Sequence, residues 1–96
     1  MTKIGSFKIE TSFNITGRGI VVSGQVIEGV PLVGTFLSAN ISGEEEIIKI
    51  IGTEIGNPDA NGIMKFGLLL SIEDPLRVKH IGENKIKEQV VSIFKD

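Results

Sequence analysis

The sequence predicts an all-β protein, a small closed antiparallel β-barrel of about six strands. Apolar and polar residues alternate repeatedly along the chain, which is typical of strands with one buried face. Glycine-containing turns separate these alternating stretches at short intervals, as they do in small barrels. Gly24 lies inside one of the stretches, where a missing side chain marks a bulge or a close backbone approach. Such kinks help a small sheet curl into a barrel.

The first predicted strand carries its apolar side chains on odd-numbered positions, so one face is expected to point into the core: Phe7, Ile9, Thr11, Phe13 and Ile15. In the turn that follows, Gly17 and Gly19 flank Arg18, and glycine adopts positive φ without steric cost. The segment from Ile20 to Ile27 is the return strand, because it is rich in β-branched residues.

A second turn over Glu28–Pro31 leads into a third predicted strand over Thr35–Ala39. A polar turn is expected over Ile41–Glu46, and a strand over Glu46–Ile55. Both faces of this strand carry isoleucine, which a strand with one buried face does not need. The loop Gly56–Gly62 is dense in turn-forming residues.

The next strand is predicted over Ile63–Ile72, with the apolar residues at even positions on one face: Met64, Phe66, Leu68, Leu70 and Ile72. The segment Leu76–Ile81 fits either a short helical turn after Asp74 and Pro75 or a strand. The last strand is predicted over Ile86–Phe94.

One stretch, residues 13–34, resembles the second domain of translational GTPases such as elongation factor Tu. The resemblance is carried by the number and spacing of the glycines and of the apolar residues between them: Phe13, Ile15, Gly17, Arg18, Gly19, Val21, Val22, Gly24, Val26, Gly29 and Gly34. It implies a small antiparallel β-barrel of that type. In the family this domain contacts the aminoacyl end of tRNA or ribosomal RNA.

The chain also departs from the family pattern. Ser71 replaces the second glycine of a Gly-x-x-Leu-x-Gly-Ile strand, and Thr35 stands where an acidic residue is common. The segment before Gly67 does not resemble the pocket motif of the family, so its RNA-contacting residues are not carried over to this chain.

Length and composition predict one domain over residues 1–96, with a formal net charge of −2 and no cysteine. The Lys and Arg residues are scattered rather than clustered, unlike the basic patches of typical nucleic-acid-binding domains. No signal-peptide core and no apolar run of roughly 18 residues is present, so we expect a cytoplasmic protein without membrane association.

Catalytic, metal-binding and cofactor motifs are not recognisable, and the expectation is a protein that is not an enzyme. The glycine pair Gly19 and Gly24 has phosphate-loop spacing but lacks the lysine that follows in GTP-binding loops, and Lys87 stands where a guanine-reading aspartate would be. GTP binding is therefore not expected. His80 is the only histidine, and the acidic run Glu44–Glu46 reads as a solvated loop rather than a cation site.

These observations predict a non-catalytic binding module that engages a protein partner or a second copy of itself. The candidate surface is the strand face with Ile47, Lys49 and Ile51, since either register of this strand leaves two isoleucines on the outside. The alternative is an RNA-contacting module with a translation-related role. Arg18, the cation at the first hairpin turn, is the candidate residue for a phosphate contact, although solvation of the turn explains it equally well.

Overall fold

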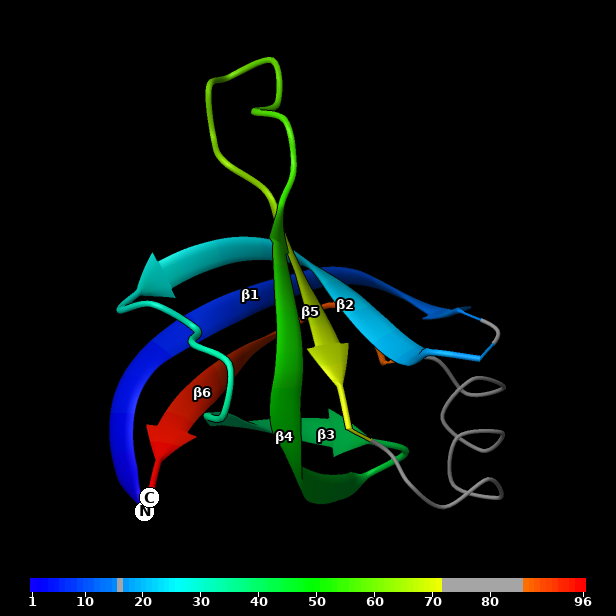
Figure 1. The fold of residues 1–96 in the computed structure, drawn as a ribbon, viewed down its shortest axis with the longest axis vertical. Helices are drawn as coiled ribbons and strands as arrows, with labels where there is room; N and C mark the ends of the chain where they lie inside the picture. Colours follow the sequence, from blue (N-terminus) through cyan, green and yellow to red (C-terminus); the bar gives the residue numbers. More distant parts are fainter. Residues whose placement is uncertain (16, 72–85) are drawn as a thin grey trace.

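The computed structural model describes residues 1–15, 17–71 and 86–96, and these residues form an all-β barrel without a helix (Figure 1). Every paired strand is antiparallel, and the sheet closes in the order β1-β2-β5-β4-β3-β6. The strands are β1 Thr2–Ile15, β2 Gly19–Glu28, β3 Phe36–Ile41, β4 Glu44–Ile55, β5 Phe66–Leu70 and β6 Gln89–Lys95. The predicted fold class is therefore confirmed.

The barrel interior is filled by apolar side chains from all six strands and from Ile86. Successive inward positions alternate with outward ones, as the pleat of a strand requires. The fully buried side chains are Phe7, Ile9, Ile20, Val22, Leu37, Ile50, Leu68, Leu70 and Ile93. Burying this set is the main favourable contribution to folding, because the hydrophobic effect grows with the apolar area removed from water.

The inward face of β1 changes halfway along the strand, which corrects one prediction. Pairing with β2 shifts register between Ile9 and Thr11. Before the shift Ile9 is buried, whereas after it Ser12 lies opposite the buried Val22 and Phe13 is 48% exposed. A one-residue slip moves every following side chain to the other face of a sheet. The odd-numbered pattern therefore fails from Thr11 onward.

Gly24 lies beside this irregularity, where β1 and β2 come close together. A Cβ atom at Gly24 would lie 1.8 Å from the carbonyl oxygen of Lys8, a distance that no real Cβ contact reaches. The predicted close backbone approach is confirmed. The predicted positive φ of the turn glycines is also confirmed, at 80° for Gly17 and 123° for Gly19.

The loop between β4 and β5 is longer than predicted and projects from the barrel (Figure 1). Asp59 fixes its conformation, because its Oδ1 accepts hydrogen bonds from the backbone amides of Asn61 and Ile63, at 2.9 and 3.0 Å. Consequently β5 begins at Phe66 rather than at Ile63, and Met64 lies exposed outside the strand.

The other strand boundaries move by a few residues. The polar turn predicted over Ile41–Glu46 contracts to Ser42 and Gly43, and β4 starts at Glu44. Ile72, His80 and the ambiguous segment Leu76–Ile81 lie outside the described residues.

The barrel closes between β3 and β6 with the help of one side chain. Backbone pairing of these strands covers only Phe36, Leu37 and Ser38 on β3. Beyond it, the side-chain amide of Gln89 accepts a hydrogen bond from the Asn40 amide at 2.8 Å and donates one to the Asn40 carbonyl at 2.9 Å. The Gln89 side chain thus supplies the acceptor and the donor that backbone groups of β6 would otherwise provide to Asn40 of β3.

Candidate functional site

A hollow on the outer surface of the barrel, here called the outer pocket, lies over β1, β2, β5 and β4. Its floor follows one cross-strand row, in which Phe13 pairs with Val21, Val21 with Leu69, and Leu69 with Gly52. All four residues line the pocket, whose volume is about 200 Å³. The outward turn of Phe13 after the β1 irregularity contributes the aromatic wall.

Two glycines keep the outer pocket open. A Cβ atom at Gly52 would lie 3.2 Å from the Cβ of Leu69, and one at Gly67 would lie 3.5 Å from Cγ1 of Val21. Side chains at these positions would occupy the space that the pocket now leaves empty. Sequence reasoning missed this site, because the row of residues is visible only after the strand register is known.

Arg18 and Glu54 give the outer pocket its charges. Arg18 lies at the turn between β1 and β2, where its amide donates to the carbonyl oxygen of Ile15 at 3.0 Å. Glu54 comes from the far side, on β4. The pocket therefore offers an apolar floor with a guanidinium and a carboxylate in its lining, a combination that suits a flat apolar group bearing polar substituents.

The second candidate surface is the β4 outer face, defined by Glu45, Ile47, Lys49 and Ile51. The intervening Ile48 and Ile50 are buried in the core, whereas Ile47 and Ile51 are 54% and 44% exposed. The prediction that this strand leaves two isoleucines on the outside is confirmed.

On β3, the β4 outer face has one small polar neighbour and one aromatic neighbour. On the neighbouring strand β3, Ser38 lies beside Ile47, and its hydroxyl donates a hydrogen bond to the Glu45 carboxylate. Phe36 lies beside Lys49, which has no ion-pair partner within residues 1–15, 17–71 and 86–96. Because its neighbour on β3 is the short Ser38, the Ile47 side chain projects beyond the surface next to it.

The structure separates the sequence-predicted site residues into two groups. Ile47, Lys49 and Ile51 share one strand face, as expected. Arg18 belongs to the outer pocket, which β4 reaches only through Gly52, Thr53 and Glu54. The two surfaces adjoin along β4 but do not form a single site.

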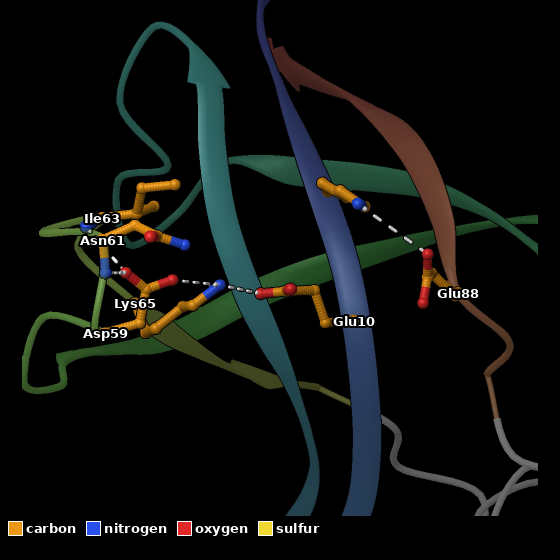
Figure 2. Close-up of polar contacts among 7 residues, drawn as sticks. Glu10, Asp59, Asn61, Ile63, Lys65 and Glu88 are labelled. Atoms are coloured by element: carbon orange, nitrogen blue, oxygen red, sulfur yellow. Dashed lines mark hydrogen bonds and ion pairs between the residues drawn. The ribbon is translucent and has the colours of Figure 1, made fainter.

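A third group of residues, which is polar, holds the β4–β5 loop against the barrel (Figure 2). The Lys65 ammonium lies 2.5 Å from Oε1 of Glu10 and 3.7 Å from Oδ2 of Asp59, so it ties the projecting loop to β1. The hydrogen bond to Glu10 raises the pKa of Lys65, and the amide of Ile63 lowers the pKa of Asp59. The charged side chains of Glu10, Asp59 and Lys65 all interact with one another or with backbone amides, so this group is not a candidate ligand site.

Two features that often mark function are absent from the described part of the chain. No group of three or more His, Asp or Glu side chains there is placed to hold a metal ion. Likewise, residues 1–15, 17–71 and 86–96 contain no helix with the length and apolar character needed to cross a membrane.

Comparison with known proteins does not place the chain in a family. No protein-family model matches the sequence, and no curated protein is significantly similar to it. The resemblance of residues 13–34 to the second domain of translational GTPases thus stays a prediction.

Proposed function

We propose that this barrel is a non-catalytic binding module that engages a protein partner or a second copy of itself through the β4 outer face. The observation that carries the proposal is the exposure of Ile47 and Ile51 on a strand whose other face already fills the core. Neither side chain is needed for the barrel interior. Apolar side chains gathered on one face with polar neighbours are the usual core and rim of a protein-binding surface.

The first experiment measures molar mass by light scattering over a protein concentration series. Ile47→Lys and Ile51→Lys, singly and together, are compared with the parent chain. The matched control is Ile27→Lys on β2, because Ile27 is 55% exposed and Ile47 is 54% exposed. The parent and the control are expected to gain mass with concentration, whereas the β4 variants stay at one chain mass.

A parent chain that keeps one chain mass at every concentration removes the self-associating form of this proposal and leaves a partner protein as the ligand. Loss of association in Ile27→Lys as well as in the β4 variants would contradict the assignment to the β4 outer face.

The second candidate function is an RNA-contacting module with a translation-related role, and the outer pocket favours it. In this proposal a nucleobase stacks on the apolar floor formed by Val21 and Leu69, and Arg18, which also lines the pocket, contacts a phosphate. The resemblance to translation-factor domains supports the same candidate. The net charge of −2 and the scattered Lys and Arg residues count against it, which is why it ranks second.

Filter binding to total RNA at two salt concentrations tests the RNA candidate. Binding through phosphates weakens steeply as salt rises, and losing one phosphate contact lowers the salt slope by about one. Arg18→Gln is expected to show that loss, whereas Lys87→Gln, which removes an exposed cation outside the pocket, is not. Equal effects of the two substitutions, or no retention of RNA at low salt, would exclude a specific RNA site at Arg18.

A further inference from the structure

The charges of the β4 outer face are arranged so that the face complements itself. Along the outward positions the order is Glu45, Ile47, Lys49, with the apolar side chain in the middle and opposite charges two residues away on either side. A rotation that reverses the strand direction about Ile47 exchanges the two charged positions. We infer that a second copy of this chain packs face to face on the β4 outer face, related by a two-fold axis through Ile47.

The two-fold axis through Ile47 can lie along the strand or across it, and the charges favour the second orientation. With the axis along the strand, equal residues would face each other, and Glu45 would oppose Glu45 of the second copy. With the axis across the strand, Glu45 of each copy faces Lys49 of the other, and Ile47 meets its own counterpart. The second orientation therefore forms two ion pairs, whereas the first forms two like-charged contacts, one between the Glu45 side chains and one between the Lys49 side chains.

The neighbouring residues fit the same register. The two-fold axis that crosses β4 places Ser38 opposite Ser38 of the second copy, and these short side chains leave room for Ile47. Ile51 comes to lie over the turn at Gly43, where a Cβ atom would have no neighbour within 4 Å. Sheets packed face to face keep their strands within about 30° of each other, so these pairings survive the usual twist.

The contact is made by strand faces rather than strand edges. Within the closed barrel, β4 pairs with β3 over Glu44–Lys49 and with β5 over Ile50–Ile55. In the described part of the chain, every strand of the closed barrel has a hydrogen-bonded neighbour on both sides, so none is an edge strand of the sheet. The interface is small, so the dimer is expected to be weak and concentration-dependent.

This inference rests on the proposed function, and charge reversal tests it separately. Glu45→Lys and Lys49→Glu each turn two attractive contacts into repulsive ones, and each is expected to raise the dimer dissociation constant about tenfold. An equimolar mixture of the two variants restores opposite charges at both contacts, so it is expected to dimerise as well as the parent or better. Sedimentation equilibrium at low salt measures the dissociation constants of the parent, the two variants and their mixture. At higher salt the differences between these constants are expected to become smaller.

Matched controls separate the register from general charge attraction. Glu28→Lys and Lys87→Glu change the net charge by the same amounts at exposed positions outside the β4 outer face, and each is expected to dimerise like the parent. Glu45→Gln and Lys49→Gln remove attraction without adding repulsion, so smaller losses are expected. Circular dichroism of every variant checks that the barrel is intact.

Three outcomes would overturn the inference. One is a parent chain that never dimerises, and another is a loss of dimerisation in Glu28→Lys and Lys87→Glu as large as that in Glu45→Lys and Lys49→Glu. The third is loss of dimerisation in Ile47→Lys together with unchanged dimerisation in both charge reversals. That last result would refute the two-fold register while leaving the β4 outer face as the binding surface.

Discussion

Gly24 is the residue at which β1 and β2 come closest. A methyl group there would overlap the carbonyl oxygen of Lys8, at 1.8 Å, and would also lie 3.2 Å from the amide nitrogen of Glu10. Both atoms belong to the backbone and cannot rotate away. Gly24→Ala is therefore expected to lower the free energy of unfolding by about 1–3 kcal/mol, through overpacking and backbone strain. The urea midpoint measures this change.

Gly67→Ala is the matched control for Gly24→Ala. At Gly67 the added methyl group would make only an ordinary contact, 3.5 Å from Cγ1 of Val21. Its effect on the free energy of unfolding is expected to stay within about 0.5 kcal/mol, the usual range for benign substitutions. Equal urea midpoints for the two variants would show that β1 moves aside without cost.

The loop between β4 and β5 depends on the ionised form of one carboxylate. Asp59 accepts hydrogen bonds from two backbone amides and lies near Lys65, and these contacts lower its pKa below the ordinary value of 3.8. A group whose pKa is lower in the folded state stabilises that state when it is ionised. Its contribution is present above pH 3.8 and is lost as the pH falls through the lower folded-state pKa.

This pH dependence is measurable at the amides that Asp59 holds. The hydrogen-exchange protection of Asn61 and Ile63 is expected to fall in that acidic window after correction for the intrinsic rate. In Asp59→Asn the amide oxygen still accepts hydrogen bonds but does not titrate, so the protection should no longer change in this window. Glu54→Gln removes an exposed carboxylate elsewhere and is expected to behave like the parent. If the protection of these amides still fell at acidic pH in Asp59→Asn, the fall would have to be caused by the titration of another group.

At the level of strands, sequence periodicity predicted the elements better than their faces. The alternation in β4 predicted both the buried Ile48 and Ile50 and the exposed Ile47 and Ile51. The pairing of β4 with β3 is regular from Glu44 to Lys49, and the register shift in its pairing with β5 comes only between Ile50 and Gly52. In β1 the same reasoning placed Phe13 inside. The register shift after Ile9 arises from pairing with β2, so it is a property of two strands and is invisible in the pattern of one.

The outer pocket shows the same limitation at the candidate site. The floor of the pocket is formed by Phe13, Val21 and Leu69, which lie in one row across neighbouring strands. The pocket is deep because the residues beside this row on β4 and β5 are glycines. Each strand contributes one or two residues that look unremarkable alone. Sequence reasoning identified Arg18 as exposed at a turn but had no means of placing it beside an apolar floor.

For the molecule as a whole, the closed barrel explains why fold class was predictable and partner identity was not. Closure follows from local features, namely alternating strands, glycine turns and a close approach at Gly24. The outer pocket, in contrast, depends on register, because the apolar row behind Arg18 joins residues of four strands. Such an arrangement emerges only from the assembled sheet.

The pairing of the first strand with the last has a practical consequence. Thr2 of β1 lies opposite Lys95 of β6, so the chain enters and leaves the barrel at one place, while the β4–β5 loop projects elsewhere (Figure 1). Domains with adjacent ends tolerate insertion and circular permutation well. The barrel can therefore be spliced into a surface loop of a host protein without forcing the two sides of that loop apart. A peptide displayed on the projecting loop would then stand away from the splice point.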